Sequence, residues 1–170
     1  MKNKTSFKIA KLANNEWVKA FGYIPQQPQE KLKGEFYSLA RLSTEEDYNL
    51  APIGEVILDY LHEEYYSEDN KGDFAGFENS IKSIRAKLED IIAQEDKLAE
   101  NGLEVNLSVV AIKANVAYLA VIGEMRISVI RDSEIVDVTE ALQDSNYTGF
   151  LYTGSFDLKP QDIVVLSTEA

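Results

Sequence analysis

The sequence predicts an α+β protein in which two antiparallel β-sheets form a sandwich and an antiparallel pair of helices covers one outer face. Short segments of alternating or continuously apolar residues, typical of strands, lie before residue 43 and after residue 106. Between them, two consecutive segments carry apolar residues at helical spacing. This order differs from the βα alternation of a parallel sheet. Two helices could not cover both faces of one large sheet, so a sandwich buries the apolar strands best.

The length and composition are those of one globular domain, which we place at residues 1–170. A compact chain of this size buries roughly 70% of its unfolded surface. Hydrophobic residues make up 45% of the sequence, an ordinary share for a globular protein. The chain has no cysteine, which excludes disulfides, a cysteine nucleophile and thiolate metal sites. A cysteine-free chain fits a reducing compartment, so we expect a cytoplasmic protein.

Charge and hydropathy exclude two classes of partner. Acidic residues outnumber basic ones by 29 to 17, and the net charge of −12 would repel the phosphate backbone of a nucleic acid. No apolar run approaches the ~20 residues that cross a bilayer. Residues 1–7 are positively charged but lack the apolar core of a signal peptide. We therefore expect no nucleic acid and no membrane as a partner of this chain.

Three strands are predicted in the N-terminal part, at residues 7–12, 16–23 and 35–42. Each alternates apolar and polar side chains, at least in part, over a length typical of a strand. Pro25 and Pro28 separate the second strand from the third, because proline lacks a backbone donor and restricts the residue before it. We expect no regular element around these prolines.

A first helix is predicted to begin after Asn49, which is a favourable N-cap residue. Pro52 then falls in the first turn, where its missing N–H costs little. The apolar face of this helix consists of Ile53, Val56, Ile57, Tyr60, Leu61 and Tyr65. We expect that face to be buried.

A second, longer helix is predicted from Phe74 to Glu100. Its apolar residues keep a helical spacing, with Glu95 in the one vacancy of the stripe. Asn101 and Gly102 end the helix, because both tolerate left-handed dihedral angles. The stripe favours a helix packed on a sheet, and a coiled coil is the alternative.

After Gly102 the pattern changes from helical to extended. Strands are predicted at residues 107–112, 116–122, 126–131, 134–138 and 163–167. The connections at residues 114–115 and 132–133 are short, which favours an antiparallel meander. Residues 139–154 are predicted to form a loop.

The order of elements over residues 105–170 resembles that of metal-dependent, PPM-type serine/threonine phosphatases. Residues 115–126 resemble the family's stretch that ends in GDSR. Residues 126–139 resemble the stretch that follows it, and residues 158–170 resemble the one that ends in TDG. The two preceding helices agree in position with the family's helix pair. The resemblance implies the same sandwich, without the C-terminal segment with which family members continue.

The resemblance also implies what the family's chemistry would need. Family members hold two divalent cations through aspartates, and the cations activate a water molecule that attacks phosphorus. The aspartate of GDSR corresponds to Glu124, and that of TDG corresponds to Glu169. The extra methylene of glutamate displaces the carboxylate by roughly 1.5 Å, which disturbs a tight octahedral site. Where the family has DGhGG, residues 41–44 of this chain contain Leu42 and no carboxylate.

Glu124 and Glu169 are therefore the candidate metal-binding residues, for Mn or Mg, and no catalytic residue is assigned. The alternative is that both are solvated acids at strand ends. Three functions stay open. The favoured one is a non-catalytic, pseudophosphatase-like domain that binds or regulates a protein partner and needs no cofactor. The others are a divergent Mn- or Mg-dependent protein phosphatase and a structural or oligomerisation domain with the long helix as its interface.

Other polar and aromatic features have ordinary structural interpretations. His62 is the single histidine and is flanked by Asp59 and Glu63, so we expect it at the surface. Residues 69–73 resemble a calcium loop but lack its closing glutamate. The aromatic residues around that loop are Tyr65, Tyr66, Phe74 and Phe77. We expect them to pack in the core, with a partner surface as the alternative.

Overall fold

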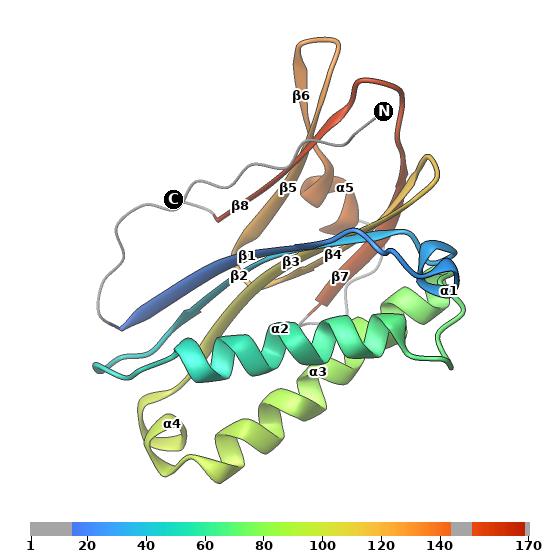
Figure 1. Ribbon diagram of the computed structural model, residues 1–170. Coiled ribbons are helices and arrows are strands. Elements are labelled where there is room, and N and C mark those ends of the chain that lie inside the picture. The colour runs from blue at the N-terminus through green and yellow to red at the C-terminus, as the bar shows by residue number, and fades with distance from the viewer. Residues whose placement is uncertain (1–14, 144–150, 169–170) are drawn as a thin grey trace.

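The computed structural model describes residues 15–143 and 151–168. It shows two stacked antiparallel sheets with the two longest helices on one outer side (Figure 1). In chain order the elements are β1 (Glu16–Tyr23), α1 (Pro28–Lys31), β2 (Glu35–Ser43), α2 (Ala51–Tyr66), α3 (Phe74–Gln94), α4 (Asp96–Asn101), β3 (Glu104–Lys113), β4 (Val116–Ile122), β5 (Met125–Arg131), β6 (Glu134–Asp137), α5 (Val138–Gln143), β7 (Leu151–Asp157) and β8 (Ile163–Thr168). The larger sheet has the order β1-β2-β3-β4-β7 and the smaller one β6-β5-β8. The predicted α+β sandwich is confirmed. Among these helices, none is long and apolar enough to cross a membrane.

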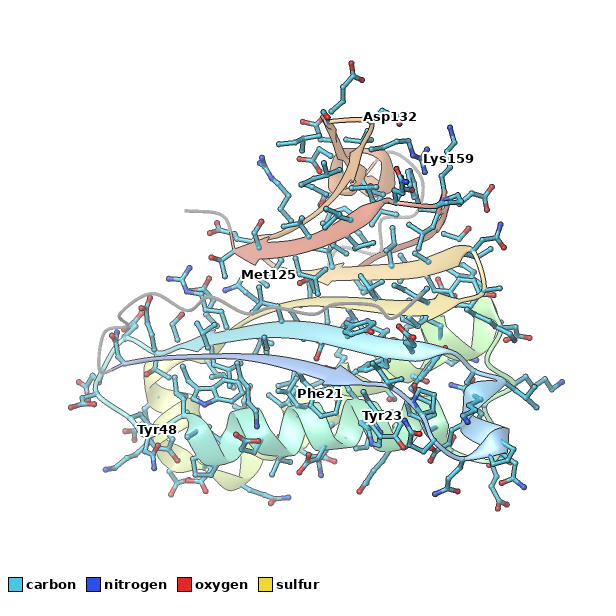
Figure 2. All side chains as sticks on the ribbon, turned by 45° about the horizontal axis from the view of Figure 1, so that its top comes forward. Phe21, Tyr23, Tyr48, Met125, Asp132 and Lys159 are labelled. Atoms are coloured by element: carbon cyan, nitrogen blue, oxygen red, sulfur yellow. The ribbon has the colours of Figure 1, made fainter. Side chains whose placement is uncertain are left out.

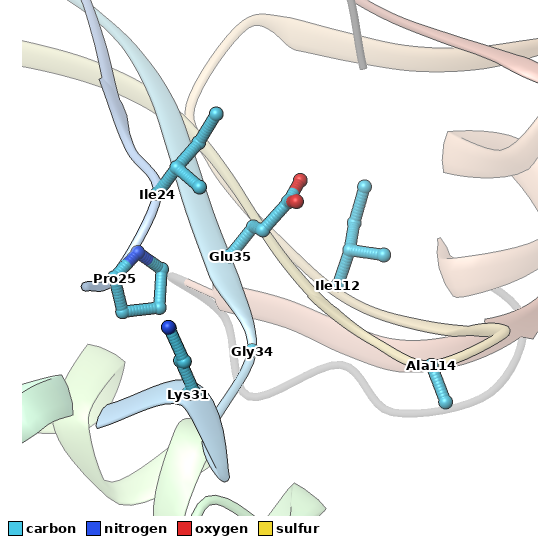
Figure 3. A pocket seen from close by; sticks show the side chains of 7 residues that line it. All are labelled: Ile24, Pro25, Lys31, Gly34, Glu35, Ile112 and Ala114. Atoms are coloured by element: carbon cyan, nitrogen blue, oxygen red, sulfur yellow. The ribbon is translucent and has the colours of Figure 1, made fainter. Parts of the chain in front are cut away.

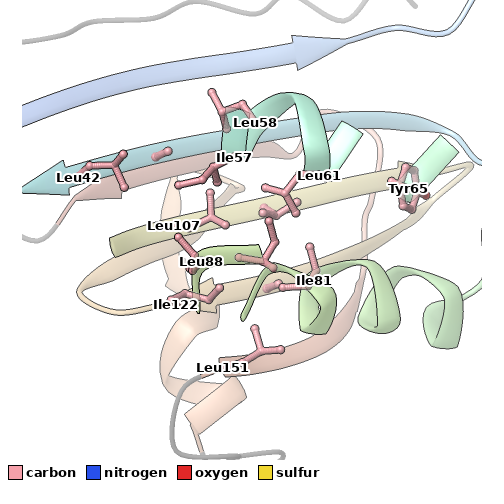
Figure 4. Close-up of a cluster of buried hydrophobic side chains, with 14 of the residues drawn as sticks. Leu42, Ile57, Leu58, Leu61, Tyr65, Ile81, Leu88, Leu107, Ile122 and Leu151 are labelled. Carbon is pink, nitrogen blue, oxygen red and sulfur yellow. The ribbon is translucent and has the colours of Figure 1, made fainter. Parts of the chain in front are cut away.

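The main core lies between the larger sheet and the helices α2 and α3. Every second residue of β2 faces this core, and Phe36, Ala40 and Leu42 are at most 1% exposed. Ile57 and Leu61 of α2 belong to the same buried cluster (Figure 4). Burying one such large side chain contributes about 1.5–3 kcal/mol, so the pairing of helices with this sheet is strongly favoured. The helix layer therefore fixes which face of β2 points inward.

A second core fills the space between the two sheets. Val110, Leu119 and Val121 reach it from the larger sheet, and Ile127 and Val129 reach it from the smaller one. β3 contributes to both cores, with Leu107 and Val109 under the helices and Val110 between the sheets. The strand predicted at residues 107–112 is confirmed, and it lies in the centre of the larger sheet.

The connections between strands differ from a simple meander. Positive φ angles at Ala114 (56°) and Asp132 (52°) confirm the two predicted tight turns. Between them, however, the chain leaves the larger sheet after β4 and enters the smaller sheet at β5. Figure 2 shows Met125 and Asp132 at opposite ends of β5. On the side away from β3, β4 pairs with β7 and not with β5, so the predicted meander is only partly right.

The predicted long helix is in fact two helices, α3 and α4, that meet at Glu95. This residue has extended dihedral angles (φ −125°, ψ 93°) and caps both helices. A carboxylate in the apolar stripe would be buried without a charged partner, which is costly. The chain turns at Glu95 and leaves its side chain exposed, where Tyr48 Oη donates a hydrogen bond to it (3.1 Å). Gly102 ends α4 with a φ of 68°, as predicted.

The predicted first helix is α2, with two differences. Its N-cap is Leu50 rather than Asn49, whose Oδ1 accepts a hydrogen bond from Ala51 N at 3.3 Å. Val56, which was expected in the apolar face, is 44% exposed, whereas Leu58 is buried. The helix packs against both the sheet and α3, so its buried face is rotated from the stripe that the sequence suggested.

Other differences lie at element ends. Residues 28–31 form α1, because proline is tolerated in a first helical turn. The strand expected at 134–138 ends at Asp137, whose side chain accepts backbone hydrogen bonds from the first turn of α5. The loop expected at 139–154 thus contains most of α5 and the start of β7. The strand expected at 7–12 lies outside the described residues.

Candidate functional site

Polar side chains gather at one end of the larger sheet, where β1 and β3 begin and β2 and β4 end. The register places Glu16, Ser43 and Glu104 opposite one another on three neighbouring strands, and Arg41 opposite Asn106. Residues at this spacing share one face of the sheet, the face that looks toward the smaller sheet. We define the strand-end cluster as Glu16, Arg41, Ser43, Glu104, Asn106 and Glu124.

Arg41 is the cation of the strand-end cluster. Its Nη2 donates a hydrogen bond to Glu16 Oε1 at 2.5 Å, and the two side chains are 29% and 23% exposed. This hydrogen bond raises the pKa of Arg41 above its ordinary value, although partial burial opposes it. The charges of Glu104 and Glu124 act in the same direction as Glu16. A permanently charged guanidinium therefore lies in the field of three carboxylates.

Glu104 is held by neutral hydrogen-bond donors. Asn106 Nδ2 donates to its Oε1 at 2.8 Å, and Ser43 Oγ donates to its Oε2 at 3.0 Å. The bond from Asn106, then that from Ser43, lowers the pKa of Glu104, and Arg41 adds a smaller effect. Glu104 is thus ionised at neutral pH, and protein donors contact both of its carboxylate oxygens.

Asn106 connects the strand-end cluster to the crossover between the sheets. Its side chain is buried, and its Oδ1 accepts a hydrogen bond from Glu124 N at 2.5 Å. At Gly123, where φ is +68°, a Cβ atom would lie 2.2 Å from Asn106 Oδ1 and 2.8 Å from Val105 O. Only glycine fits this position, so Asn106 and Gly123 together fix the path from β4 to β5.

The positions that the sequence singled out have separate surroundings. The side chain of Glu124 is exposed at the rim of the strand-end cluster, and only its backbone N–H is held by Asn106. Leu42 is fully buried in the core under the helices, so its side chain points away from the cluster. Glu169 lies outside the described residues, and a metal site formed by Glu124 and Glu169 stays a prediction.

Sequence reasoning missed the roles of Glu16, Arg41, Glu104 and Asn106. Arg41 and Glu16 are 25 residues apart, and only the pairing register of β1 with β2 brings them together. One signal was available in the sequence. Asn106 is a polar residue directly before the mainly apolar centre of β3, and a buried amide needs hydrogen-bond partners.

The described residues do not fit a centre for two divalent cations. Mn and Mg bind several oxygen ligands at once, mainly carboxylates and waters. Within residues 15–143 and 151–168, no group of three or more His, Asp or Glu side chains could hold a metal ion. Arg41 also stands among the carboxylates, and its fixed charge would repel a cation. The strand-end cluster is thus a polar network in which the one guanidinium of Arg41 offsets part of the charge of three carboxylates.

Solved structures with the same arrangement of strands and helices are serine/threonine phosphatases. The catalytic domain of PstP, in complex with two manganese ions, is 13% identical, with a TM-score of 0.60 over 89% of this chain and 76% of that one. The chain has the PPM-type phosphatase fold. The S. agalactiae serine/threonine phosphatase, also 13% identical, has a TM-score of 0.57 and covers 89% of this chain and 78% of that one.

A third similar structure is PppA, described as a key regulatory component of T6SS in Pseudomonas aeruginosa. It is 13% identical, with a TM-score of 0.56 over 89% of this chain and 75% of that one. No protein-family model matches the sequence, and no curated protein matches it. At such low identity the likeness concerns the fold, which rests on strand register and packing rather than on shared residues.

His62, expected at the surface, is half-buried among aromatic rings. Its ring centroid lies 4.4 Å from that of Tyr23 and 5.0 Å from that of Tyr66. Phe21 and Tyr23 project from the side of β1 that faces α2 (Figure 2). In the described part of the chain, His62 Nε2 is buried without a hydrogen-bond partner, and burial lowers the pKa of His62 despite nearby acids such as Glu30. His62 is a packing residue, which corrects the expected surface position.

The calcium-like loop at residues 69–73 is organised by its own side chains. Asn70 Oδ1 accepts a hydrogen bond from Gly72 N (2.8 Å), and Asn70 Nδ2 donates one to Ser80 Oγ (2.8 Å). Asp73 caps α3 through a hydrogen bond from Gly76 N (2.8 Å). The nearby Tyr65 and Phe77 are fully buried, which confirms the expected core role of these two aromatic residues.

A shallow depression opens at the opposite end of the larger sheet (Figure 3). Its volume is about 410 Å³, and it is lined by Ile24, Pro25, Lys31, Gly34, Glu35, Ile112 and Ala114. Among the described residues that line it, Lys31 and Glu35 are charged and the others are aliphatic residues and a glycine. An open hollow with two charged side chains does not have the convergent polar groups of an enclosed catalytic pocket.

Proposed function

We propose that this chain is a non-catalytic domain with the PPM-type fold that acts as a protein-binding or regulatory module. The observation that supports this most is the position of Arg41 in the strand-end cluster. A metal-dependent phosphatase uses bound cations to supply positive charge and an activated water. Here the guanidinium of Arg41 supplies positive charge to Glu16 and lies in the field of Glu104. Arg41 has no proton to lose at neutral pH, so it activates no water.

The surroundings of Leu42 and Glu124 support the same proposal. Leu42 has no atom that can bind a metal, and it is part of the core under the helices. The Glu124 carboxylate is exposed, so water solvates its charge, and it lies in the field of Arg41. In this proposal the sandwich is retained and Arg41 offsets part of the negative charge at its strand ends.

A protein partner is part of the proposal. The net charge of −12 favours a partner with a basic surface, because charge complementarity accelerates and orients association. PppA, which is similar in fold, is described as a regulatory component, and this is compatible with a regulatory role for this chain. We place the module in the cytoplasm, as the absence of cysteine suggests.

The test combines a phosphatase assay on a generic phosphoester with titration calorimetry of Mn and Mg. We expect turnover at the background rate and no saturable heat of binding. Glu124→Ala and Glu169→Ala are the matched variants, and we expect neither to change these results. Robust metal-dependent turnover that Glu169→Ala abolishes would overturn the proposal.

A divergent Mn- or Mg-dependent phosphatase is the second candidate, because PstP, with the same fold, is bound to two manganese ions. In that case Glu124 and Glu169 would be metal-binding residues. An ion that binds only the folded state raises the melting temperature. A melting temperature that stays constant in excess Mn and Mg would exclude this candidate.

A further inference from the structure

His62 lies where α2 packs on β1, and it combines a titratable ring with a buried polar atom. The ring is half-buried, and none of the described residues forms a hydrogen bond with its Nε2. A neutral imidazole carries a proton on one nitrogen, whereas an imidazolium carries an N–H on both. In a protonated His62, Nε2 would therefore be a buried donor without an acceptor on a charged ring, and both features are costly.

Three aromatic rings surround His62. Its ring centroid lies 5.7 Å from that of Phe21 and 4.4 Å from that of Tyr23, both on β1. The ring of Tyr66, on α2 itself, lies at 5.0 Å. These rings replace water around the imidazole with apolar surface, which favours its neutral form.

The two tyrosine hydroxyls in this group are already engaged. Tyr23 Oη donates a hydrogen bond to Glu30 Oε2 (2.6 Å), and Tyr66 Oη donates one to Gly34 O (2.7 Å). The hydrogen bond to Glu30 raises the pKa of Tyr23, and burial raises the pKa of Tyr66, so both side chains are neutral at physiological pH. Neither tyrosine supplies an anion that would pair with a charged His62.

The titratable groups around His62 in the described part of the chain are Tyr23 of β1, Glu30 of α1, and Asp59, Glu63 and Tyr66 of α2. The charges of the three acids favour protonation of His62, whereas burial opposes it. Burial is the larger effect, so the pKa of His62 lies below its ordinary value of 6.5. Asp59 and Glu63 are exposed on α2, where salt and water screen their charges.

We propose that His62 is a pH-sensitive contact whose protonation loosens the end of α2 from β1. Above pH 6.5 the neutral ring packs among the aromatic side chains and stabilises the fold. As the pH falls below 6.5, the released state takes up a proton more readily than the packed state, and this contribution is lost. Tyr23 connects the contact to α1 through Glu30, so release would also loosen α1, which is followed by the exposed Leu32. Mildly acidic pH would thus expose more apolar surface at this end of the molecule.

The composition of the chain gives this proposal a narrow pH window. His62 is the only histidine, and the chain has no cysteine. Between about pH 7 and about pH 5.5, no other side chain with an ordinary pKa changes its charge to a large extent. Uptake of one proton on release raises the equilibrium constant for unfolding by up to about tenfold per pH unit. This dependence begins near pH 6.5 and ends at the lower pKa of folded His62.

The test is urea unfolding of the full 170-residue chain at about pH 7 and about pH 5.5, followed by the fluorescence of Trp17. Trp17 of β1 lies against Gly54 of α2, so its signal reports the packing of this helix on this strand. The urea midpoint of the wild type should be lower at the acidic pH. His62→Phe keeps an aromatic ring but cannot titrate, and its midpoint should stay the same. His62→Gln is a second non-titrating variant with the same expected result. An equal fall in the wild type and in these variants would overturn the proposal.

Two measurements on the wild-type chain need no variant. The single histidine gives one Cε1–H signal in a proton NMR titration, and its midpoint in the folded protein should lie below 6.5. A midpoint at or above 6.5 would contradict the proposal, because the aromatic rings would then stabilise the charged form through cation–π contacts. Hydrogen exchange, corrected for the intrinsic effect of pH, should accelerate in β1 and at the end of α2 at about pH 5.5, and not in β4. Unchanged exchange in both β1 and α2 would also refute it.

Discussion

Arg41 and Leu42 are neighbours in the chain, and the same change to aspartate at each position should have opposite outcomes. Their side chains lie on opposite faces of β2, Arg41 in the cluster and Leu42 in the core under the helices. Arg41→Asp and Leu42→Asp each place a new carboxylate at this end of the sheet. We expect the first variant to fold and gain affinity for Mn, and the second to unfold.

The magnitudes follow from burial. Leu42 is fully buried, and removing such a side chain costs about 2–5 kcal/mol. The new carboxylate would be buried without a partner, which adds several kcal/mol, and domains have only about 5–15 kcal/mol of stability. The Arg41 and Glu16 side chains are 29% and 23% exposed, so loss of their ion pair and the repulsion by the new carboxylate together cost roughly 1–3 kcal/mol, less than the total stability of a domain.

Unfolding in urea, followed by the fluorescence of Trp17, measures both variants. Trp17 is the only tryptophan, and its ring lies directly against α2 at Gly54, so its signal reports helix–sheet packing. Arg41→Asp should melt at a higher temperature in excess Mn, since an ion at about 100 times its Kd stabilises by about 2.7 kcal/mol. The wild-type protein should show no such rise. A Leu42→Asp variant as stable as the wild type, or an equal effect of Mn on the wild type, would refute the reasoning.

Three further predictions concern single contacts. Tyr65→Phe removes the hydrogen bond that Tyr65 Oη donates to the backbone carbonyl of Lys33 (2.6 Å). It should lower the unfolding free energy by about 1–3 kcal/mol in urea titrations. A change near zero would mean that the bond is not made. Gly123→Ala forces a Cβ against Asn106 Oδ1 at a positive φ. We expect the free energy of unfolding to fall by at least about 1 kcal/mol, measured by thermal unfolding. An unchanged melting temperature would contradict the described crossover. The hydrogen bond from Arg131 lowers the pKa of Asp162 to about 2, below its ordinary value of 3.8. Asp162 therefore stabilises the fold above pH 3.8, and this contribution is lost as the pH falls toward 2. Asp162→Asn should flatten that part of the profile of stability against pH, and a profile identical to the wild type would count against the ion pair.

The layers of the fold could be predicted because each follows from a local pattern. Alternation in β2 and a helical stripe in α2 show which elements have a buried face. The break at Glu95 could not be predicted from the stripe, because a helix tolerates one polar position in its apolar face when solvent can reach it. Whether solvent reaches Glu95 depends on how α3 lies on the sheet, and that is a property of the packed structure.

The strand-end cluster was less accessible to sequence reasoning for a related reason. Glu124 could be placed at a strand end from the resemblance, and its exposed position agrees with a strand-end acid. The partnership of Arg41 with Glu16 depends on the register of β1 against β2, and a shift by one residue would move Arg41 to the opposite face. The pairing register is set by the hydrophobic cores as a whole, so no local sequence motif predicts the ion pair of Arg41 with Glu16.

The hydrogen bonds of Asn106 at the crossover from β4 to β5 have a mechanical consequence. The same buried amide contacts Glu104 in the larger sheet and Glu124, the residue just before β5 of the smaller sheet, so a sliding of the two layers past each other would strain these hydrogen bonds. A displacement of the smaller sheet would therefore weaken the hydrogen bond that the amide of Glu124 donates to Asn106. The hydrogen-exchange rate of the Glu124 amide therefore reports whether the two sheets move together.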